Sequence, residues 1–274
     1  MASVLVTGKG VSGSWIIRGV QLGNAIGAHV EAHALRSKAD LVIGVKRVTP
    51  QIASAYRGRL IWDVVDAWPQ PYGNEWDETT CKKWIASEIE RLRPIGLIAA
   101  TKQMATDLSG FGLPVLWLPH HYRPGVERNP IRPDVKFIGY EGSPPYIEAW
   151  RPAIESVCQR IGAKFILNPP SLADLDIVLA LRGATGYGPR KWKSNVKLAN
   201  AHGSGTPFIG SPESGYTEMA TGTEYWADNE SELAVAVGYL SDRNRRLHVQ
   251  EQFLKARFSL EQAAEKLKAW LATI

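Results

Sequence analysis

Short apolar runs alternate with longer segments of helical periodicity along most of the chain. Strands are predicted at residues 2–7, 41–45, 60–66, 97–100 and 115–118, with helices at 15–26, 75–92 and 102–108. The second half repeats the pattern, with strands at 135–139, 164–167, 176–181 and 207–209 and helices at 147–161, from Lys193 onward, and at 260–271. Strands that alternate with helices predict parallel sheets covered by helices, so the fold class is α/β.

A stretch rich in proline, from Pro119 to Pro133, separates the two runs of alternation. We place a domain boundary there. A chain of 274 residues is long enough for two α/β lobes of roughly 100 to 150 residues each. We expect an N-terminal lobe over residues 1–122, a C-terminal lobe over 123–258 and a closing helix over 259–274.

The most informative segment is KSNVKLANAHGSGTPFI at residues 193–209, which GYTE follows at 215–218. It predicts a helix, then a Gly-Thr-Pro turn and a buried strand. Lys193, Lys197 and Asn200 are spaced i, i+4 and i+7. A helix would therefore place two ammonium groups and a carboxamide on one face, which can receive a ligand that carries phosphate.

This segment resembles the nucleotide-sugar motif of glycosyltransferases with the GT-B fold, especially their retaining branch, in which Lys-Leu-x-Glu-Ala precedes Gly-Thr-Pro. The resemblance implies two Rossmann-like α/β lobes with a ligand cleft between them. It also implies a sugar nucleotide in the C-terminal lobe and the acceptor over the N-terminal lobe. This chain departs from the family at Asn200 and Trp192, where relatives carry Glu, and at Glu141, where they place Arg and Lys.

The resemblance suggests which residues bind the donor. Arg182, Lys193 and Lys197 are assigned to the diphosphate, because fixed cations neutralise the charge of a leaving diphosphate; a solvated basic helix face is the alternative. The nucleotide and sugar are assigned to Asn200, Thr206, Glu213, Gly215, Tyr216 and Glu218. Gly215 permits close approach of the backbone, and Glu218 is predicted to begin a helix, although ordinary helix capping explains the same residues.

A glycine-rich loop follows the first predicted strand. Gly10, Ser12 and Gly13 precede a helix, so the loop can cradle a donor phosphate or approach the acceptor. The loop departs from Gly-x-Gly-x-x-Gly, lacks the Lys-Ser/Thr ending of a P-loop, and no acidic residue ends the expected ribose strand. These departures argue against a dehydrogenase.

Three further residues are catalytic candidates. Asp63 and Asp66 end a predicted strand, where α/β sheets place their ligands, and either can bind acceptor hydroxyls or act as a general base. Turn capping is the alternative reading of both. His120 falls in the predicted hinge, where it can bond a donor phosphate or hydroxyl or simply be held by the backbone.

Composition adds little to this picture. The formal charge of +5 and the pI near 9.1 favour an anionic partner only weakly. Two cysteines and no visible secretory signal suggest a cytoplasmic protein, with no transmembrane segment but with peripheral membrane contact allowed. We expect no cofactor beyond the nucleotide sugar, UDP-sugar being favoured. We expect no metal, because Asp174-Leu-Asp176 leads directly into an apolar strand.

The sequence therefore predicts a metal-independent glycosyltransferase that moves a sugar from a nucleotide diphosphate to a hydroxyl acceptor, with retention of configuration. Its first expected acceptor is a bacterial envelope or exopolysaccharide glycan. Two alternatives stay open. One is a phage-type enzyme that modifies DNA by glycosylating hydroxymethylated bases, and the other is a non-catalytic protein that binds nucleotides or glycans.

Overall fold

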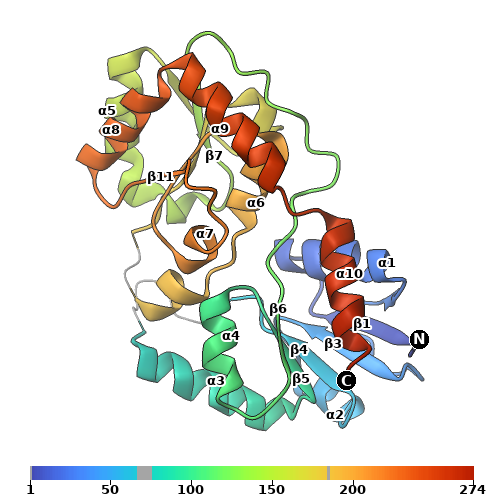
Figure 1. Ribbon diagram of the computed structural model, residues 1–274. Coiled ribbons are helices and arrows are strands. Elements are labelled where there is room, and N and C mark those ends of the chain that lie inside the picture. The colour runs from blue at the N-terminus through green and yellow to red at the C-terminus, as the bar shows by residue number, and fades with distance from the viewer. Residues whose placement is uncertain (1, 67–75, 184–185) are drawn as a thin grey trace. The chain divides into compact units, whose positions relative to one another are not determined.

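The computed structural model describes residues 2–66, 76–183 and 186–274. They form two compact units, and Figure 1 labels many of their helices and strands. The first unit comprises Met1–His120, Thr185–Ser194 and Leu260–Ile274, and the second comprises His121–Ala184 and Asn195–Ser259. The α/β class is confirmed. Residues 186–194 belong to the first unit, although the described residues before and after them along the chain belong to the second.

A six-stranded sheet forms the centre of the first unit. All neighbouring strands are parallel. Their order is β2 (His29–Val30), β1 (Val4–Gly8), β3 (Leu41–Val45), β4 (Leu60–Asp63), β5 (Gly96–Ala99) and β6 (Val115–Trp117). Helices cover the sheet: η1 (Trp15–Gln21), α1 (Leu22–Ile26), α2 (Pro50–Ala55), α3 (Glu78–Leu92), α4 (Lys102–Ser109) and α10 (Leu260–Leu271).

A parallel five-stranded sheet forms the centre of the second unit. Its order is β11 (Tyr225–Trp226), β10 (Phe208–Gly210), β9 (Ile177–Ala180), β7 (Phe137–Tyr140) and β8 (Lys164–Leu167). The helices are α5 (Arg151–Ile161), α6 (Val196–Ser204), α7 (Ser214–Thr217), α8 (Glu230–Leu240) and α9 (Arg243–Ala256), with 3-10 turns at Pro144–Tyr146, Glu148–Trp150 and Leu172–Asp174.

Each sheet has a topological switch point beside its first strand. In the first unit the chain passes from β1 to β2 on one side and then to β3 on the other. In the second unit it passes from β7 to β8 and then to β9 on the opposite side. Ligands of open α/β sheets bind outside the carboxyl ends of the strands at such points. The topology therefore marks the loops after β1 and β3, and those after β7 and β9.

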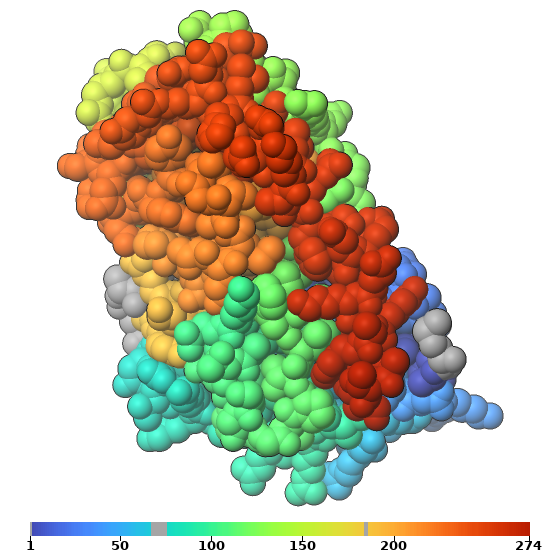
Figure 2. All heavy atoms as spheres, viewed as in Figure 1, coloured from blue at the N-terminus to red at the C-terminus, as the bar shows by residue number. Residues whose placement is uncertain are grey.

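Each unit has its own hydrophobic core. Trp62 and Trp192 are fully buried in the core of the first unit, and Phe208 and Phe253 in that of the second. Helix α10 contacts α1 in the first unit, and Figure 2 shows α10 in red beside the blue N-terminal region. Within residues 2–66, 76–183 and 186–274, no helix combines the length and apolar character needed to cross a bilayer.

The segment that returns to the first unit is anchored by aromatic side chains. Its π-helical turn η5 (Gly188–Trp192) packs against α4. Asp107 of α4 accepts hydrogen bonds from the Tyr187 hydroxyl at 2.7 Å and from the Trp192 indole at 2.8 Å. The rings of Trp84 and Trp192 lie 6.4 Å apart. Burial of this large aromatic surface explains why the segment packs in the first unit, although the chain before and after it belongs to the second.

Several predicted boundaries are corrected. The helix predicted at 15–26 is a π-helix followed by α1, and the helix predicted from Lys193 begins at Val196. The helix at 147–161 opens with a 3-10 turn and becomes α-helical at Arg151. Strands β2 and β11 were not predicted, because two residues are too short to show a period.

Candidate functional site

The glycine-rich loop of the first unit lies at its switch point, directly after β1. Gly10 has a φ of +72° and Val11 a φ of +34°, in the left-handed region. Val11 is 97% exposed. Ser12 turns the chain into the helix, because its hydroxyl accepts the N–H of Trp15 at 3.1 Å. Gly10 permits the turn, while the Ser12 hydroxyl is already engaged in capping.

Lys46 follows β3 at the same edge of the sheet. Its φ of +57° is left-handed, a conformation that costs a residue with a side chain about 1–3 kcal/mol. Two hydrogen bonds hold it: its N–H donates to the Asp63 carbonyl at 2.7 Å, and its carbonyl accepts the Trp62 indole at 2.9 Å. The fold thus fixes the direction in which the Lys46 side chain leaves the sheet.

The glycine-rich loop and the residues after β3 enclose a hollow of about 230 Å³. We call it the glycine-loop hollow. It is lined by Lys9, Gly10, Val11, Ser12, Trp15, Val45, Lys46 and Arg47. A Cβ at Gly19 would lie 2.5 Å from the Trp15 ring, so a glycine there lets that ring pack against the helix.

Asp66 joins two cations of the first unit. Its carboxylate lies 2.8 Å from the Lys46 ammonium and 3.0 Å from the Lys193 ammonium. Burial acts to raise the pKa of Asp66, but the two lysines outweigh it and hold the pKa well below its ordinary value. Asp66 therefore remains ionised and engaged, which makes it a poor general base.

Asp63 forms a buried ion pair with Arg18 of η1. Its carboxylate lies 3.5 Å from the Arg18 Nε, and both side chains are at most 2% exposed. Arg18 also donates to the Leu118 carbonyl. Burial raises the pKa of Asp63 against the opposing effect of Arg18. Since Asp63 is 1% exposed, its side chain does not reach a ligand at the surface of this unit.

His120 is the last residue of the first unit and His121 the first of the second. Both are buried, at 2% and 1% exposure. The domain boundary predicted after residue 122 stays a prediction. The catalytic role assigned to His120 stays a prediction.

In the second unit, Arg182 follows β9 at the switch point. Its Nε donates to the Glu213 carboxylate at 2.5 Å, and its backbone N–H donates to the Ser211 hydroxyl at 3.0 Å. Burial acts to lower the pKa of Arg182, but Glu213 outweighs it and the pKa lies above its ordinary value. Arg182 thus carries its charge throughout the accessible pH range.

Lys197 lies on α6, beside the loop that follows β7. Its ammonium lies 4.5 Å from the centroid of the Tyr140 ring, in cation-π geometry. A Cβ at Gly142 would approach that ammonium to 2.9 Å. The predicted single face of Lys193, Lys197 and Asn200 is wrong, because Lys193 precedes α6 and belongs to the first unit.

Asn200, on α6, links two segments of the second unit. Its carbonyl oxygen accepts the N–H of Arg123 at 2.9 Å, and its amide donates to the Glu141 carboxylate at 3.3 Å. Arg123 and Glu141 are themselves paired. The loop after β7 therefore brings the Glu141 carboxylate next to Asn200. In the sequence, Glu141 was noted only as a departure from the family's pattern.

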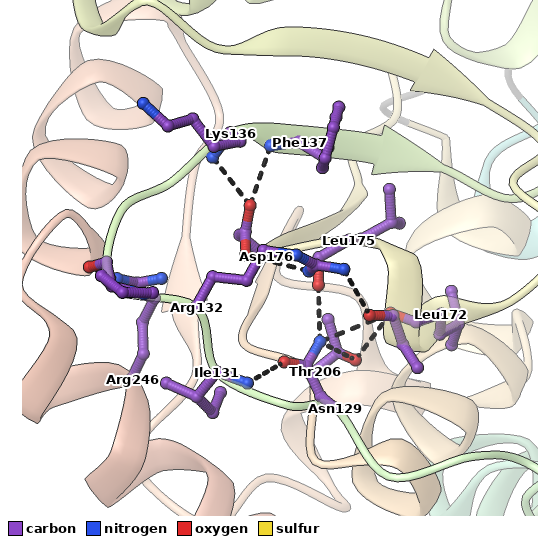
Figure 3. A network of polar contacts seen from close by, with 12 residues as sticks. Asn129, Ile131, Arg132, Lys136, Phe137, Leu172, Leu175, Asp176, Thr206 and Arg246 are labelled. Atoms are coloured by element: carbon purple, nitrogen blue, oxygen red, sulfur yellow. Dashed lines mark hydrogen bonds and ion pairs between the residues drawn. The ribbon is translucent and has the colours of Figure 1, made fainter.

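Thr206 is fully buried within the second unit. Its hydroxyl donates to the Leu172 carbonyl at 3.1 Å and lies 2.8 Å from the Ser204 hydroxyl. The Asn129 amide donates to it at 3.1 Å, as Figure 3 shows. These contacts give Thr206 a structural role, and we do not include it in the proposed site.

The Asp-x-Asp pair also has structural contacts. Asp176 accepts the N–H groups of Lys136 at 2.7 Å and Phe137 at 2.9 Å (Figure 3). Asp174 accepts the N–H of Ser171 at 3.2 Å. In the part of the chain that the structure describes, no three or more His, Cys, Asp or Glu side chains form a group able to hold a metal ion.

The predicted glycine loop of the second unit forms the short helix α7. Glu213 is its N-cap, Gly215 and Tyr216 lie within it, and Glu218 ends it. The prediction that Glu218 begins a helix is therefore wrong. The backbone N–H of Glu218 bonds back to Ser214, which closes the helix. Tyr216 is buried, which raises the pKa of its hydroxyl.

Sequence reasoning missed Lys46 and the pairing of Arg18 with Asp63. Lys46 directly follows an apolar strand. Ligands of open α/β sheets bind outside the carboxyl ends of strands at a switch point, so Lys46 becomes a candidate once the strand order is known. Arg18 lies in the first turn of a helix that also has exposed residues. Its side chain is buried against Asp63, which is distant in sequence. No local pattern indicates that pairing.

No family model and no curated protein matches the chain. Solved structures do match. Anabaena HepE in complex with UDP and glucose superposes with a TM-score of 0.69 at 11% identity, over 100% of each chain. The apo form of WaaB, a lipopolysaccharide outer core galactosyltransferase, gives 0.59 at 8% identity, over 99% of each chain. TarM gives 0.59 at 12% identity, over 85% of this chain and 54% of TarM.

The likeness to HepE and WaaB extends over nearly the whole of both chains. The sheets of both units are parallel, and both have a switch point beside the first strand. The chain therefore has the two-lobed α/β GT-B fold of these solved glycosyltransferases.

Proposed function

We propose that this chain transfers a sugar from a nucleoside diphosphate sugar to a hydroxyl group of an acceptor. UDP is the favoured nucleotide. The observation that carries the proposal is the match along the full chain to HepE, which was solved with UDP and glucose. A bacterial envelope or exopolysaccharide glycan is the proposed acceptor, which the likeness to a lipopolysaccharide galactosyltransferase supports.

The second unit is proposed to bind the donor at its own switch point. Lys197 would contact a phosphate, and Arg182 would stabilise the charge of the departing diphosphate, because both are fixed before the reaction. Glu141, held beside Asn200 at 3.3 Å, would supply the carboxylate for the ribose hydroxyls. Gly215 of α7 follows β10 at the same edge, and its backbone would approach the sugar.

The first unit is proposed to bind the acceptor. An inverting transferase needs a general base at the acceptor hydroxyl. Asp63 is buried against Arg18, and Asp66 is held by two lysines, so neither suits that task. This favours retention, in which a donor phosphate oxygen takes the acceptor proton. The anomeric configuration of the product, read by NMR, tests this point.

Titration calorimetry of UDP with the full chain tests the donor site. Lys197→Gln is expected to weaken UDP binding about tenfold, the loss of one charge-assisted contact. Lys164→Gln is the matched control, because Lys164 is exposed at the amino end of β8 and the charge change is the same. Equal UDP affinity in both variants would remove Lys197 from the site.

Turnover of a nucleotide sugar tests the activity itself. A transferase is expected to hydrolyse its donor slowly when no acceptor is present. Assays with UDP-hexoses therefore report activity before the acceptor is known. A chain that binds UDP-sugar but releases no sugar, with or without glycan acceptors, would be a binding protein rather than an enzyme.

A further inference from the structure

The donor site proposed for the second unit includes none of the residues that line the glycine-loop hollow. It lies wholly within the first unit, at the carboxyl ends of β1 and β3. That is where an open α/β sheet binds ligands. If the proposed function holds, this position belongs to the acceptor, and its lining indicates what the acceptor carries.

The electrostatic character of the hollow is strongly positive. Lys9, Lys46 and Arg47 line it, and the described residues of its lining include no acidic side chain. The nearby carboxylate of Asp66 is shared between Lys46 and Lys193. Among the residues that the structure describes here, the cations thus outnumber the carboxylate of Asp66. The second carboxylate of this edge, Asp63, is paired with the buried Arg18.

The fold holds the backbone of Lys46 in a fixed position. Its left-handed backbone is held by hydrogen bonds on both sides, to Asp63 and from Trp62. Asp66 orients its ammonium at 2.8 Å. Strained residues that the surrounding fold holds firmly are concentrated at functional sites.

Apolar groups complete the lining. Trp15 and Val45 are among its lining residues, so the hollow suits a charged group attached to a carbon framework better than a bare ion. Its volume, about 230 Å³, lies below the roughly 300–1,000 Å³ of pockets for drug-sized ligands. That space accepts one charged group and part of a sugar ring.

We propose that the glycine-loop hollow binds an anionic group of the acceptor, a phosphate, sulfate or carboxylate, so that the enzyme selects anionic over neutral glycans. The inference rests on the proposed function. In this proposal Lys9, Lys46 and Arg47 recognise the acceptor. Asp63 and Asp66 do not, because their carboxylates are held in ion pairs.

Titration calorimetry with glucose 6-phosphate, inorganic phosphate and glucose tests the proposal on the full chain. Glucose 6-phosphate is expected to bind more tightly than inorganic phosphate, and glucose to bind weakest. Lys9→Gln and Arg47→Gln are each expected to weaken glucose 6-phosphate binding about fivefold, as loss of one exposed charge contact implies. Both residues are exposed, so the variants are expected to fold.

The control is Arg57→Gln, an exposed cation of the same unit outside the hollow. It is expected to leave glucose 6-phosphate binding unchanged. Equal binding of glucose and glucose 6-phosphate would overturn the proposal, as would Lys9 and Arg47 variants that bind the probe normally.

UDP titrations of the same variants separate the donor from the acceptor. UDP affinity is expected to stay within about twofold of the parent chain, well below the fivefold loss of one charge contact. A parallel loss of UDP and glucose 6-phosphate binding would assign the hollow to the donor phosphates and overturn the acceptor assignment. If the parent chain bound glucose 6-phosphate as expected but did not bind UDP, the proposed function would be refuted and the anion site would still be supported.

Discussion

Asp66 connects the two lysines at the edge of the first sheet, and its ionisation is linked to stability. Its folded pKa lies below the unfolded value of about 3.9, so its contribution to stability is present above that pH and is lost as the pH falls below it. Asp66→Asn is expected to lower the free energy of unfolding by roughly 1–3 kcal/mol near neutral pH. Denaturant unfolding of both proteins measures the difference.

The same comparison in acid provides the check. The parent chain and Asp66→Asn are expected to approach each other in stability as the pH falls below about 4, because the unfolded parent then takes up a proton on Asp66 while the folded carboxylate stays ionised. The difference disappears only when the pH falls through the folded pKa. A gap that stays constant on acidification would mean that Asp66 contributes through its shape and not through its charge.

Arg18 and Asp63 form the buried ion pair of the first unit. Arg18→Met leaves the Asp63 carboxylate without its cation, which is expected to cost about 3–5 kcal/mol of unfolding free energy. Adding Asp63→Asn removes the unpaired charge and is expected to recover part of that loss. Urea unfolding of the single and double variants completes the cycle. Equal losses of unfolding free energy in Arg18→Met and in the double variant would show that the charge on Asp63 does not affect stability.

The loop after β1 offers a matched pair of glycines. Gly10 has a φ of +72°, while a Cβ at Gly13 meets nothing within 4 Å. Gly10→Ala is expected to lower stability by about 1 kcal/mol because alanine disfavours the left-handed region, and Gly13→Ala is expected to be close to neutral. Thermal unfolding compares them. Equal effects would argue against the left-handed turn.

Secondary structure elements show where sequence reasoning succeeded. The strands that match the predictions are short and apolar, and their burial follows from composition alone, as for β9 and β4. The predicted start of α6 at Lys193 is wrong, because a spacing of i and i+4 says which residues would share a helix face, not where the helix begins. Trp192 is buried among aromatic residues of the first unit, and this packing carries Lys193 to Asp66.

On the scale of the whole molecule, the two cysteines provide one probe for each unit. Cys81 is buried in the first unit and Cys158 in the second. Burial raises the pKa of both thiols to about 11, so both are expected to react slowly with alkylating reagents near pH 8 until their unit opens.

UDP is expected to slow the labelling of Cys158 more than that of Cys81, because a ligand stabilises the unit that binds it. The measurement is mass spectrometry of each labelled peptide after timed alkylation in mild denaturant. Labelling in full denaturant controls for intrinsic reactivity. Greater protection of Cys81 would place UDP in the first unit and contradict the donor assignment.

The amino-acid sequence by itself determined the α/β class, the GT-B resemblance and the positions of most strands, because these depend on local periodicity and on residues close together in the chain. It also placed Gly10, Arg182 and Lys197 near strand or helix ends. Only the tertiary structure decided which charges meet. Asp66 is bound by Lys46 and Lys193, Asp63 by Arg18, and Asn200 by Glu141. These partners are distant in sequence, and their pairing follows from strand order and core packing, which no local pattern specifies.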